Sequence, residues 1–191
     1  MDHYLDISLL PDPEFSQTRL MDALFSRLHR ALVTAGRQEI GISFPQVKER
    51  DESGRGLGGV LRLHGSEAPL VELMATNWLA GLRDHSAVSA VQAVPVGCTS
   101  FRTVSRVQAK SNPAKERRRL MRRKGLSEEQ AFARIPDHCA EVLDLPFVHM
   151  RSSSTGEHFL LFIRHGQIKD AAVEGAFSAY GLSSHATVPW F

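Results

Sequence analysis

Residues 3–35 read HYLDISLLPDPEFSQTRLMDALFSRLHRALVTA, and in this stretch one pattern of apolar side chains gives way to another. Residues 3–10 alternate apolar and polar side chains, which is typical of a strand with one buried face. Pro13 and Ser16 then mark the start of a helix that ends before Gly36. The leucines of this helix recur at every fourth position and predict one apolar stripe: Leu20, Leu24, Leu28 and Leu32.

The rest of the first half continues this alternation of strands and helices. The expected segments are a strand at 40–47, a polar hairpin loop at 48–59, a strand at 60–64, a helix at 67–79 and a strand at 88–96. Their order is β-α-β-β-α-β, which is the ferredoxin-like order. We therefore expect an α+β protein with a ferredoxin-like domain over residues 1–98.

A smaller α/β domain is expected over residues 99–191. Its predicted segments are an extended stretch at 102–110, a helix at about 113–124, a helix capped by Ser127 and Gln130, a helical segment at 137–144, and strands at 147–153, 158–165 and 177–182.

The predicted helix at 113–124 is very basic. Seven of the ten residues from 115 to 124 are Lys or Arg, and Glu116 is the only acidic residue among them. Five cations fall on one arc of the helix, at Lys115, Arg118, Arg119, Arg122 and Arg123. A run of charge is often only a solvated face. An arginine stripe also matches a polyanion, because guanidinium groups bond phosphate in pairs, and we predict that this helix contacts nucleic acid.

The charge of the chain is divided unevenly. The net charge is only +2, yet residues 1–100 carry 9 basic and 12 acidic side chains, whereas residues 101–191 carry 14 and 9. The first residues lack the apolar core of a secretory signal, and residues 86–101 are too short to span a bilayer. Cys98 and Cys139 lack metal-site spacing, and the nine histidines form no zinc motif. We expect a soluble, cytoplasmic protein without a metal site.

Several residues could carry chemistry, and each has two interpretations. His29 lies at the margin of the apolar stripe, either as a half-packed boundary residue or as a proton carrier. Residues 152–154 are serines at the end of a predicted hairpin, which suits turn chemistry or the binding of a phosphate or ribose. Phe159 and Tyr180 are either core residues or stacking platforms.

Arg106 and Gln108 lie two residues apart on the extended stretch, so that their side chains share a face. Arg and Gln read guanine and adenine through paired hydrogen bonds. The spacing suits such a base-reading pair and equally suits an ordinary polar surface.

Several long strings of the sequence resemble one known family. They are residues 105–113 (SRVQAKSNP), the basic helix, 126–129 (LSEE), 145–148 (LPFV) and 162–166 (FIRHG), together with both ends of the chain. The family is that of the endoribonucleases that process CRISPR precursor RNA in type I-F systems. The resemblance covers essentially the whole chain.

The resemblance implies a ferredoxin-like domain followed by a smaller domain with an arginine-rich helix. It implies cleavage of CRISPR precursor RNA at the base of the repeat hairpin, with no metal or other cofactor. It further implies that a ribose 2′-hydroxyl is the nucleophile and that the products carry a 2′,3′-cyclic phosphate and a 5′-hydroxyl. The implied partners are the hairpin RNA, which the enzyme retains after cleavage, and the other subunits of a type I-F surveillance complex.

The resemblance also implies roles for individual residues. His29 resembles the proton-transfer residue, Tyr180 the tyrosine that orients it, and Ser152 the residue that holds the 2′-hydroxyl. Ser154 is then near the scissile phosphate, and Phe159 stacks on the last base pair of the stem. Arg106 and Gln108 are similar to a pair that reads stem base pairs. The groove-binding residues are implied to be Arg118, Arg119, Arg122 and Arg123, with Arg119 nearest the cut.

A second interpretation is a hairpin-binding subunit of a CRISPR effector complex that does not cleave. The presence of both His29 and Ser152 favours the enzyme. A DNA-binding regulator is less favoured, because no helix-turn-helix with dimer symmetry is evident.

Overall fold

The computed structural model describes residues 1–51, 54–108, 113–136, 143–153 and 155–191. By its internal contacts the chain forms two compact units, one made of Met1–Arg106 with Leu145–Phe191 and the other of Val107–Asp144. The division into domains at residues 98 and 99 stays a prediction. The architecture is mixed α+β with several antiparallel sheets, as the sequence predicts.

The first strand and helix follow the sequence pattern closely. Strand β1 (His3–Leu9) buries every second side chain, and helix α1 (Gln17–Ala35) buries the whole leucine stripe. The hydroxyl of Ser16 accepts a hydrogen bond from the backbone N–H of Arg19 (3.4 Å) and caps the helix. Gly36 ends it in the left-handed conformation, with φ of 63°.

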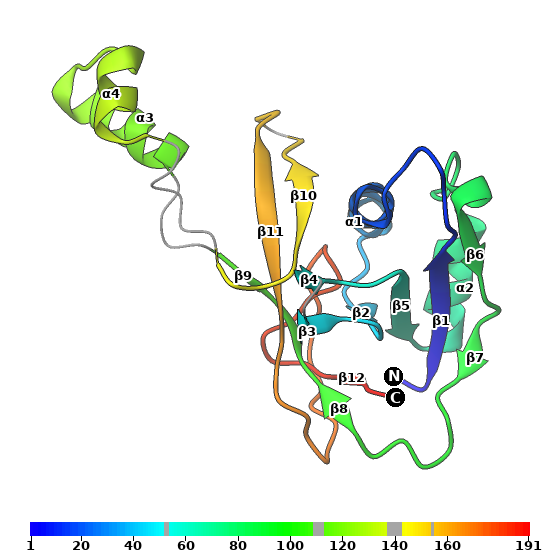
Figure 1. Ribbon diagram of the computed structural model, residues 1–191. Helices are drawn as coiled ribbons and strands as arrows, with labels where there is room; N and C mark the ends of the chain where they lie inside the picture. The colour runs from blue at the N-terminus through cyan, green and yellow to red at the C-terminus, as the bar shows by residue number, and fades with distance from the viewer. Residues whose placement is uncertain (52–53, 109–112, 137–142, 154) are drawn as a thin grey trace. The chain divides into compact units, whose positions relative to one another are not determined.

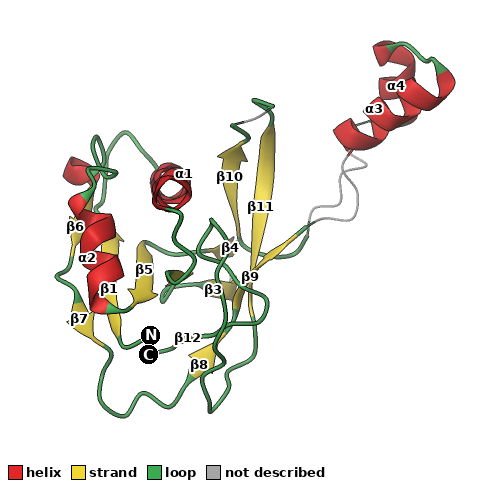
Figure 2. Cartoon of the chain, turned by 180° about the vertical axis from the view of Figure 1, so that it is seen from behind, coloured by secondary structure: helices red, strands yellow, loops and turns green. Residues whose placement is uncertain are grey.

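The main sheet joins segments from the whole first half of the chain. Its strands are β2 (Gly41–Ser43), β5 (Val60–Gly65), β1 and β6 (Ser86–Val88) in that spatial order, and β7 (Gln92–Ala93) also pairs with β1. The pairs are antiparallel. Helix α2 (Glu67–Ala75) lies across one face of this sheet, against β1 and β5 (Figure 2).

Some elements differ from their predicted bounds. The loop at 48–59 contains two short paired strands, β3 (Lys48–Asp51) and β4 (Gly54–Gly56). In place of the single strand predicted at 88–96, the structure has two short strands, β6 and β7.

The division occurs at Ser89. Its hydroxyl accepts a hydrogen bond from the backbone N–H of Asp6 (2.9 Å) and donates one to the Ala90 oxygen (2.9 Å). A side chain therefore replaces part of the strand ladder at this point. A short 3₁₀ turn, Arg83–His85, precedes β6.

A second sheet is built from the later part of the chain. Its order is β10 (Phe147–Arg151), β11 (His158–His165) and β9 (Val104–Val107). Strands β10 and β11 form an antiparallel hairpin in which Arg151 lies opposite His158. Two short strands, β8 (Phe101–Arg102) and β12 (Val188–Pro189), pair separately.

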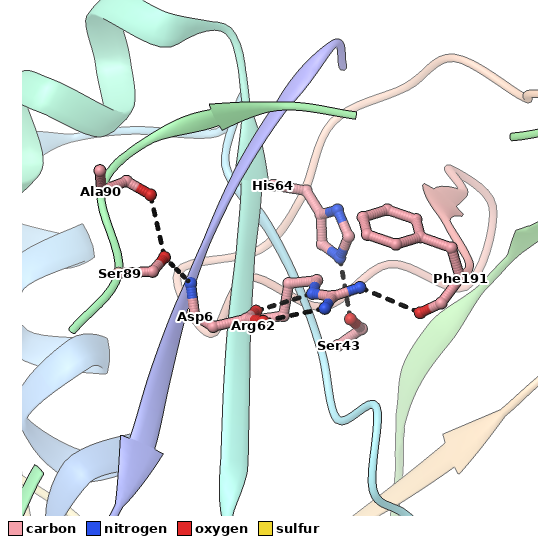
Figure 3. A network of polar contacts seen from close by, with 7 residues as sticks. All are labelled: Asp6, Ser43, Arg62, His64, Ser89, Ala90 and Phe191. Carbon is pink, nitrogen blue, oxygen red and sulfur yellow. Dashed lines mark hydrogen bonds and ion pairs between the residues drawn. The ribbon is translucent and has the colours of Figure 1, made fainter. Parts of the chain in front are cut away.

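A polar network joins the main sheet to the last residue described (Figure 3). The Arg62 guanidinium donates two hydrogen bonds to the Asp6 carboxylate (2.7 and 2.9 Å) and one to the Phe191 backbone oxygen (3.0 Å). Its carbon also lies 4.6 Å from the centre of the Tyr4 ring and 4.1 Å from that of Phe191. The pairing compensates the cost of burying the charge, and it holds the two chain ends together (Figure 1).

His64 belongs to the same region and is fully buried on β5. Its Nε2 atom lies 2.8 Å from the Ser43 hydroxyl, and Nδ1 has no hydrogen-bond partner among the described residues. Burial, together with the nearby Arg62 charge, lowers the pKa of His64 from 6.5 to about 3. The imidazole is therefore neutral in the folded protein at ordinary pH.

The second unit is a pair of helices, α3 (Pro113–Lys124) and α4 (Glu128–Arg134). Ser127 and Gln130 form the predicted capping box at the start of α4. Arg117 donates to the Ile135 backbone oxygen (2.8 Å), and its guanidinium lies over the Phe132 ring at 4.8 Å. Most of the helical segment predicted at 137–144 lies outside the described residues.

Candidate active site

His29 is held in one orientation by the main chain. It lies on α1, half-buried, and its Nδ1 atom is 2.8 Å from the backbone oxygen of Ala179. A carbonyl oxygen only accepts hydrogen bonds, so Nδ1 carries the proton of the neutral ring. The other nitrogen, Nε2, then presents a lone pair. A neutral imidazole in this tautomer can accept a proton at Nε2.

Tyr180 supports the same imidazole from the side. Its ring is parallel to that of His29, with ring centroids 4.0 Å apart and an interplanar angle of 12°. Its ring also stacks with that of the buried Phe25, at 6.3 Å and 13°. The two residues that contact the His29 ring, Tyr180 and Ala179, thus come from one short segment.

That segment is a turn, and the strand predicted at 177–182 is wrong. The Gly181 N–H donates to the Ser178 oxygen (2.8 Å), and the Ser178 N–H donates to the Leu182 oxygen (2.9 Å). Gly181 has a φ of 70°, and a Cβ atom there would lie 2.7 Å from the Ile42 side chain. Glycine is therefore required both by the backbone conformation and by the contact with β2.

Arg106 lies beside the ring of Tyr180 and also contacts a further aromatic ring. Its guanidinium carbon lies 5.5 Å from the centre of the Tyr180 ring and 5.6 Å from the centre of the Phe159 ring. Phe159 comes from β11 and packs against the core, whereas Arg106 is exposed on β9. The structure therefore brings together four of the predicted site residues: His29, Tyr180, Arg106 and Phe159.

Ser152 lies at the turn between β10 and β11. Its hydroxyl accepts from the Thr155 N–H (3.2 Å), and its backbone oxygen accepts from the Gly156 N–H (2.9 Å). Its own N–H donates to the Glu157 oxygen (2.8 Å). The turn thus fixes the backbone of Ser152 on both sides. Ser154 lies outside the described residues.

Two contacts between α1 and β10 were not predicted from the sequence. Asp22 accepts hydrogen bonds from His149, and the Ser26 hydroxyl lies 3.4 Å from the Met150 sulfur. Asp22, Ser26 and His29 are separated by four and three residues, so they share one face of the helix. That spacing could have indicated Asp22, but no local pattern indicates its partner on β10.

The four arginines of the predicted arc on α3 are exposed, whereas the structure does not describe the side chain of Lys115. The exposed arginines are Arg118, Arg119, Arg122 and Arg123. Arg117, which is outside the predicted arc, instead contacts the α4 side of the unit. Gln108 is also exposed and belongs to this second unit, whereas Arg106 belongs to the first.

The described ranges contain neither a metal-binding cluster nor a helix of membrane-spanning character. No group of three or more His, Cys, Asp or Glu side chains among these residues is arranged to hold a metal ion. Within the same residues, none of the helices combines the length and apolar character of a membrane span.

A histidine with one fixed tautomer suits proton transfer, and an exposed arginine helix is typical of proteins that contact nucleic acid. The family described as CRISPR-associated protein (Cas_Csy4) matches residues 4–191. The chain is 57% identical to a CRISPR-associated endonuclease Cas6/Csy4 of Pseudomonas aeruginosa (strain UCBPP-PA14) and 48% identical to one of Escherichia coli (strain UTI89 / UPEC). Each alignment spans 100% of both chains. The chain therefore belongs to this family of CRISPR-associated endonucleases, and the resemblance seen in the sequence is confirmed.

Proposed function

We propose that this CRISPR-associated endonuclease processes CRISPR precursor RNA by cleaving at the base of each repeat hairpin, without a metal ion. The observation that carries the proposal is the hydrogen bond between His29 Nδ1 and the Ala179 oxygen (2.8 Å). It fixes the tautomer in which Nε2 is the basic atom, and the Tyr180 ring fixes the plane of the imidazole. A base held in this way suits the removal of a proton from a hydroxyl group.

The proposed reaction is an internal transesterification. The ribose 2′-hydroxyl beside the scissile phosphate transfers its proton to Nε2 of His29, and its oxygen bonds to phosphorus. The bond from phosphorus to the 5′-oxygen breaks, and this oxygen takes up a proton. The products are a 2′,3′-cyclic phosphate and a 5′-hydroxyl. Because nucleophile and phosphate belong to one strand, alignment and a base supply much of the acceleration.

Ser152 is proposed to hold the 2′-hydroxyl and its ribose. The support is its place in a turn whose hydrogen bonds fix its backbone. Ser154 is proposed to lie close to the scissile phosphate, and this part of the proposal rests on the resemblance alone.

Recognition is proposed to divide between phosphates and bases. The exposed arginines of α3 contact phosphates in the major groove of the stem, with Arg119 nearest the cut, because their charges match a polyanion. Arg106 and Gln108 read base edges, and Phe159 stacks on the last base pair. An A-form major groove is normally too narrow for side chains, but it opens at the end of a helix. We therefore place α3 at an end of the stem.

The finer fold and the partners are part of the same proposal. The spatial order β2-β5-β1-β6, with α1 and α2 as connections, supports a ferredoxin-like domain over residues 1–98. Residues 99–191 form the second domain. We further propose that the enzyme keeps its cleaved hairpin RNA and joins other subunits of a type I-F surveillance complex.

The decisive experiment incubates the purified chain with an end-labelled repeat hairpin in EDTA. We expect cleavage by the wild type, and a decrease of about 10²–10⁴-fold in single-turnover rate for His29→Ala at nearly unchanged hairpin affinity. A hairpin with one 2′-deoxy group upstream of the cut should bind and resist cleavage.

Cleavage by His29→Ala at the wild-type rate would overturn the assignment of the base. Cleavage only after addition of a divalent ion would overturn the mechanism. Binding without any cleavage by the wild type would favour the non-cleaving subunit.

A further inference from the structure

Asp22 makes two hydrogen bonds to a single residue of another element. Its Oδ1 atom accepts from the backbone N–H of His149 (2.8 Å), and its Oδ2 atom lies 2.9 Å from Nδ1 of the same residue. The Asp22 side chain is 17% exposed, and that of His149 is 59% exposed. The carboxylate therefore holds both the main chain and the side chain of His149, which is 127 residues away in sequence.

The two residues lie on the elements that carry the proposed catalytic groups. Asp22 is seven residues before His29 on α1, which is two helical turns, so both side chains leave the same face. His149 is the middle residue of β10, and Ser152 directly follows the last residue of this strand. In Figure 1, α1 is viewed end-on beside β10. The pair thus connects the helix of the base with the strand that leads to the serine.

A second contact also joins α1 to β10. The Ser26 hydroxyl, one turn along the same helix face, donates to the Met150 sulfur (3.4 Å). A bond to sulfur is weak, so it adds little restraint by itself. Two charge-assisted bonds from Asp22 are the stronger restraint on the position of β10.

We propose that Asp22 and His149 form a positioning pair that holds the Ser152 end of β10 against the helix that carries His29. Neither residue touches the reacting atoms. The pair instead affects the alignment of the base with the 2′-hydroxyl. A displacement of about 1 Å in such an alignment can lower the rate by up to about 10²-fold. This inference rests on the proposed roles of His29 and Ser152.

The test compares single-turnover cleavage and hairpin affinity in Asp22 variants. We expect Asp22→Ala to slow cleavage by about 10-fold or more while the dissociation constant for the hairpin changes less than about 2-fold. Asp22→Asn keeps an acceptor for the His149 N–H and should recover most of the rate. His149→Ala keeps the backbone bond and should be impaired less than Asp22→Ala. The double variant should be no slower than Asp22→Ala alone.

Asp12→Ala is the matched control, because Asp12 also pairs with a histidine, His85, at 2.7 Å. That pair joins the segment after β1 to the 3₁₀ turn before β6, so its removal should affect thermal unfolding but leave the single-turnover rate unchanged. If Asp22→Ala cleaved at the wild-type single-turnover rate while His29→Ala was inactive, the positioning role of the pair would be overturned and the proposed function would stand. Equal decreases in rate in Asp22→Ala and Asp12→Ala would show a general stability effect and also overturn it. Full activity of His29→Ala would instead overturn the proposed function.

Discussion

The ring of Tyr180 lies flat against the imidazole of His29, with centroids 4.0 Å apart and 12° between the planes. The neighbouring residue in the same turn, Ala179, accepts the hydrogen bond from His29 Nδ1. One turn therefore sets both the plane of the imidazole and the position of its proton. If His29 is the base, then this turn determines its geometry.

The first prediction separates the ring of Tyr180 from its hydroxyl. Tyr180→Phe retains the stacked ring and should keep a single-turnover rate within about threefold of the wild type. Tyr180→Ala removes the ring and should slow cleavage by about 10-fold or more, because a stacked aromatic pair contributes about 0.5–1.5 kcal/mol beyond its buried area and also excludes other rotamers. If Tyr180→Phe were as slow as Tyr180→Ala, then the hydroxyl, and not the stack, would be the important group.

The second prediction concerns the exposed arginines of α3. Alanine at Arg118, Arg119, Arg122 or Arg123 should weaken hairpin binding. For each phosphate interaction that a substitution removes, the slope of log affinity against log salt should decrease by about one unit or slightly less.

Arg117→Ala is the control on the same helix. Arg117 contacts Ile135 and Phe132, so its removal should lower the thermal stability of the helix pair and keep the salt slope. An unchanged slope in all four exposed-arginine variants would show that α3 is only a solvated face.

The third prediction concerns base recognition. Arg106→Ala and Gln108→Ala should reduce discrimination between the correct stem and stems with one exchanged base pair by about 1–3 kcal/mol. The measurement is the affinity for a set of single-pair stem variants. Arg164→Ala, an exposed arginine on β11, should leave the discrimination unchanged. A uniform decrease in affinity across all stems would place Arg106 and Gln108 among the phosphate contacts.

The local elements of this fold were predictable, whereas the contacts between distant segments were not. Helix α1 follows from its leucine stripe, its Ser16 cap and its Gly36 end, which all lie within one continuous stretch. The turn at Gly181 depends on a close contact with Ile42, which lies on a strand far away in sequence. The segment at 177–182 reads FSAYGL, and nothing in it reveals a contact with Ile42, so the sequence alone suggested a strand.

The candidate site shows the same limit. His29 and Tyr180 could be named because the chain as a whole resembles a known family, but their stacking and the hydrogen bond to the Ala179 carbonyl are tertiary facts. The division between β6 and β7 depends on a hydrogen bond between Ser89 and Asp6, which are 83 residues apart. Hydrophobic periodicity reports which face of an element is buried, and not which side chain it meets.

The last prediction concerns the pH dependence of stability and involves His64. Its pKa is lowered to about 3 in the folded protein because the imidazole is fully buried and lies near the Arg62 charge. In the unfolded chain, His64 should titrate near the ordinary value of about 6.5. Between pH 3 and 6.5 the unfolded state thus binds the proton and the folded state does not. The free energy of unfolding should therefore fall as the pH is lowered below about 6.5, with a contribution of at most about 1.4 kcal/mol per pH unit from this residue.

Chemical denaturation followed by circular dichroism from pH 8 to pH 4 measures this contribution. His64→Gln keeps a polar partner for Ser43 and cannot be protonated, so its stability should fall less steeply with decreasing pH, even if it is less stable at pH 8. His158→Gln replaces an exposed histidine and should retain the wild-type slope. If the stabilities of His64→Gln and the wild type fell in parallel, the acid sensitivity of the fold would arise from other groups. A flatter dependence of stability on pH in His64→Gln alone would assign the acid sensitivity to the buried imidazole, because burial disfavours its protonated form.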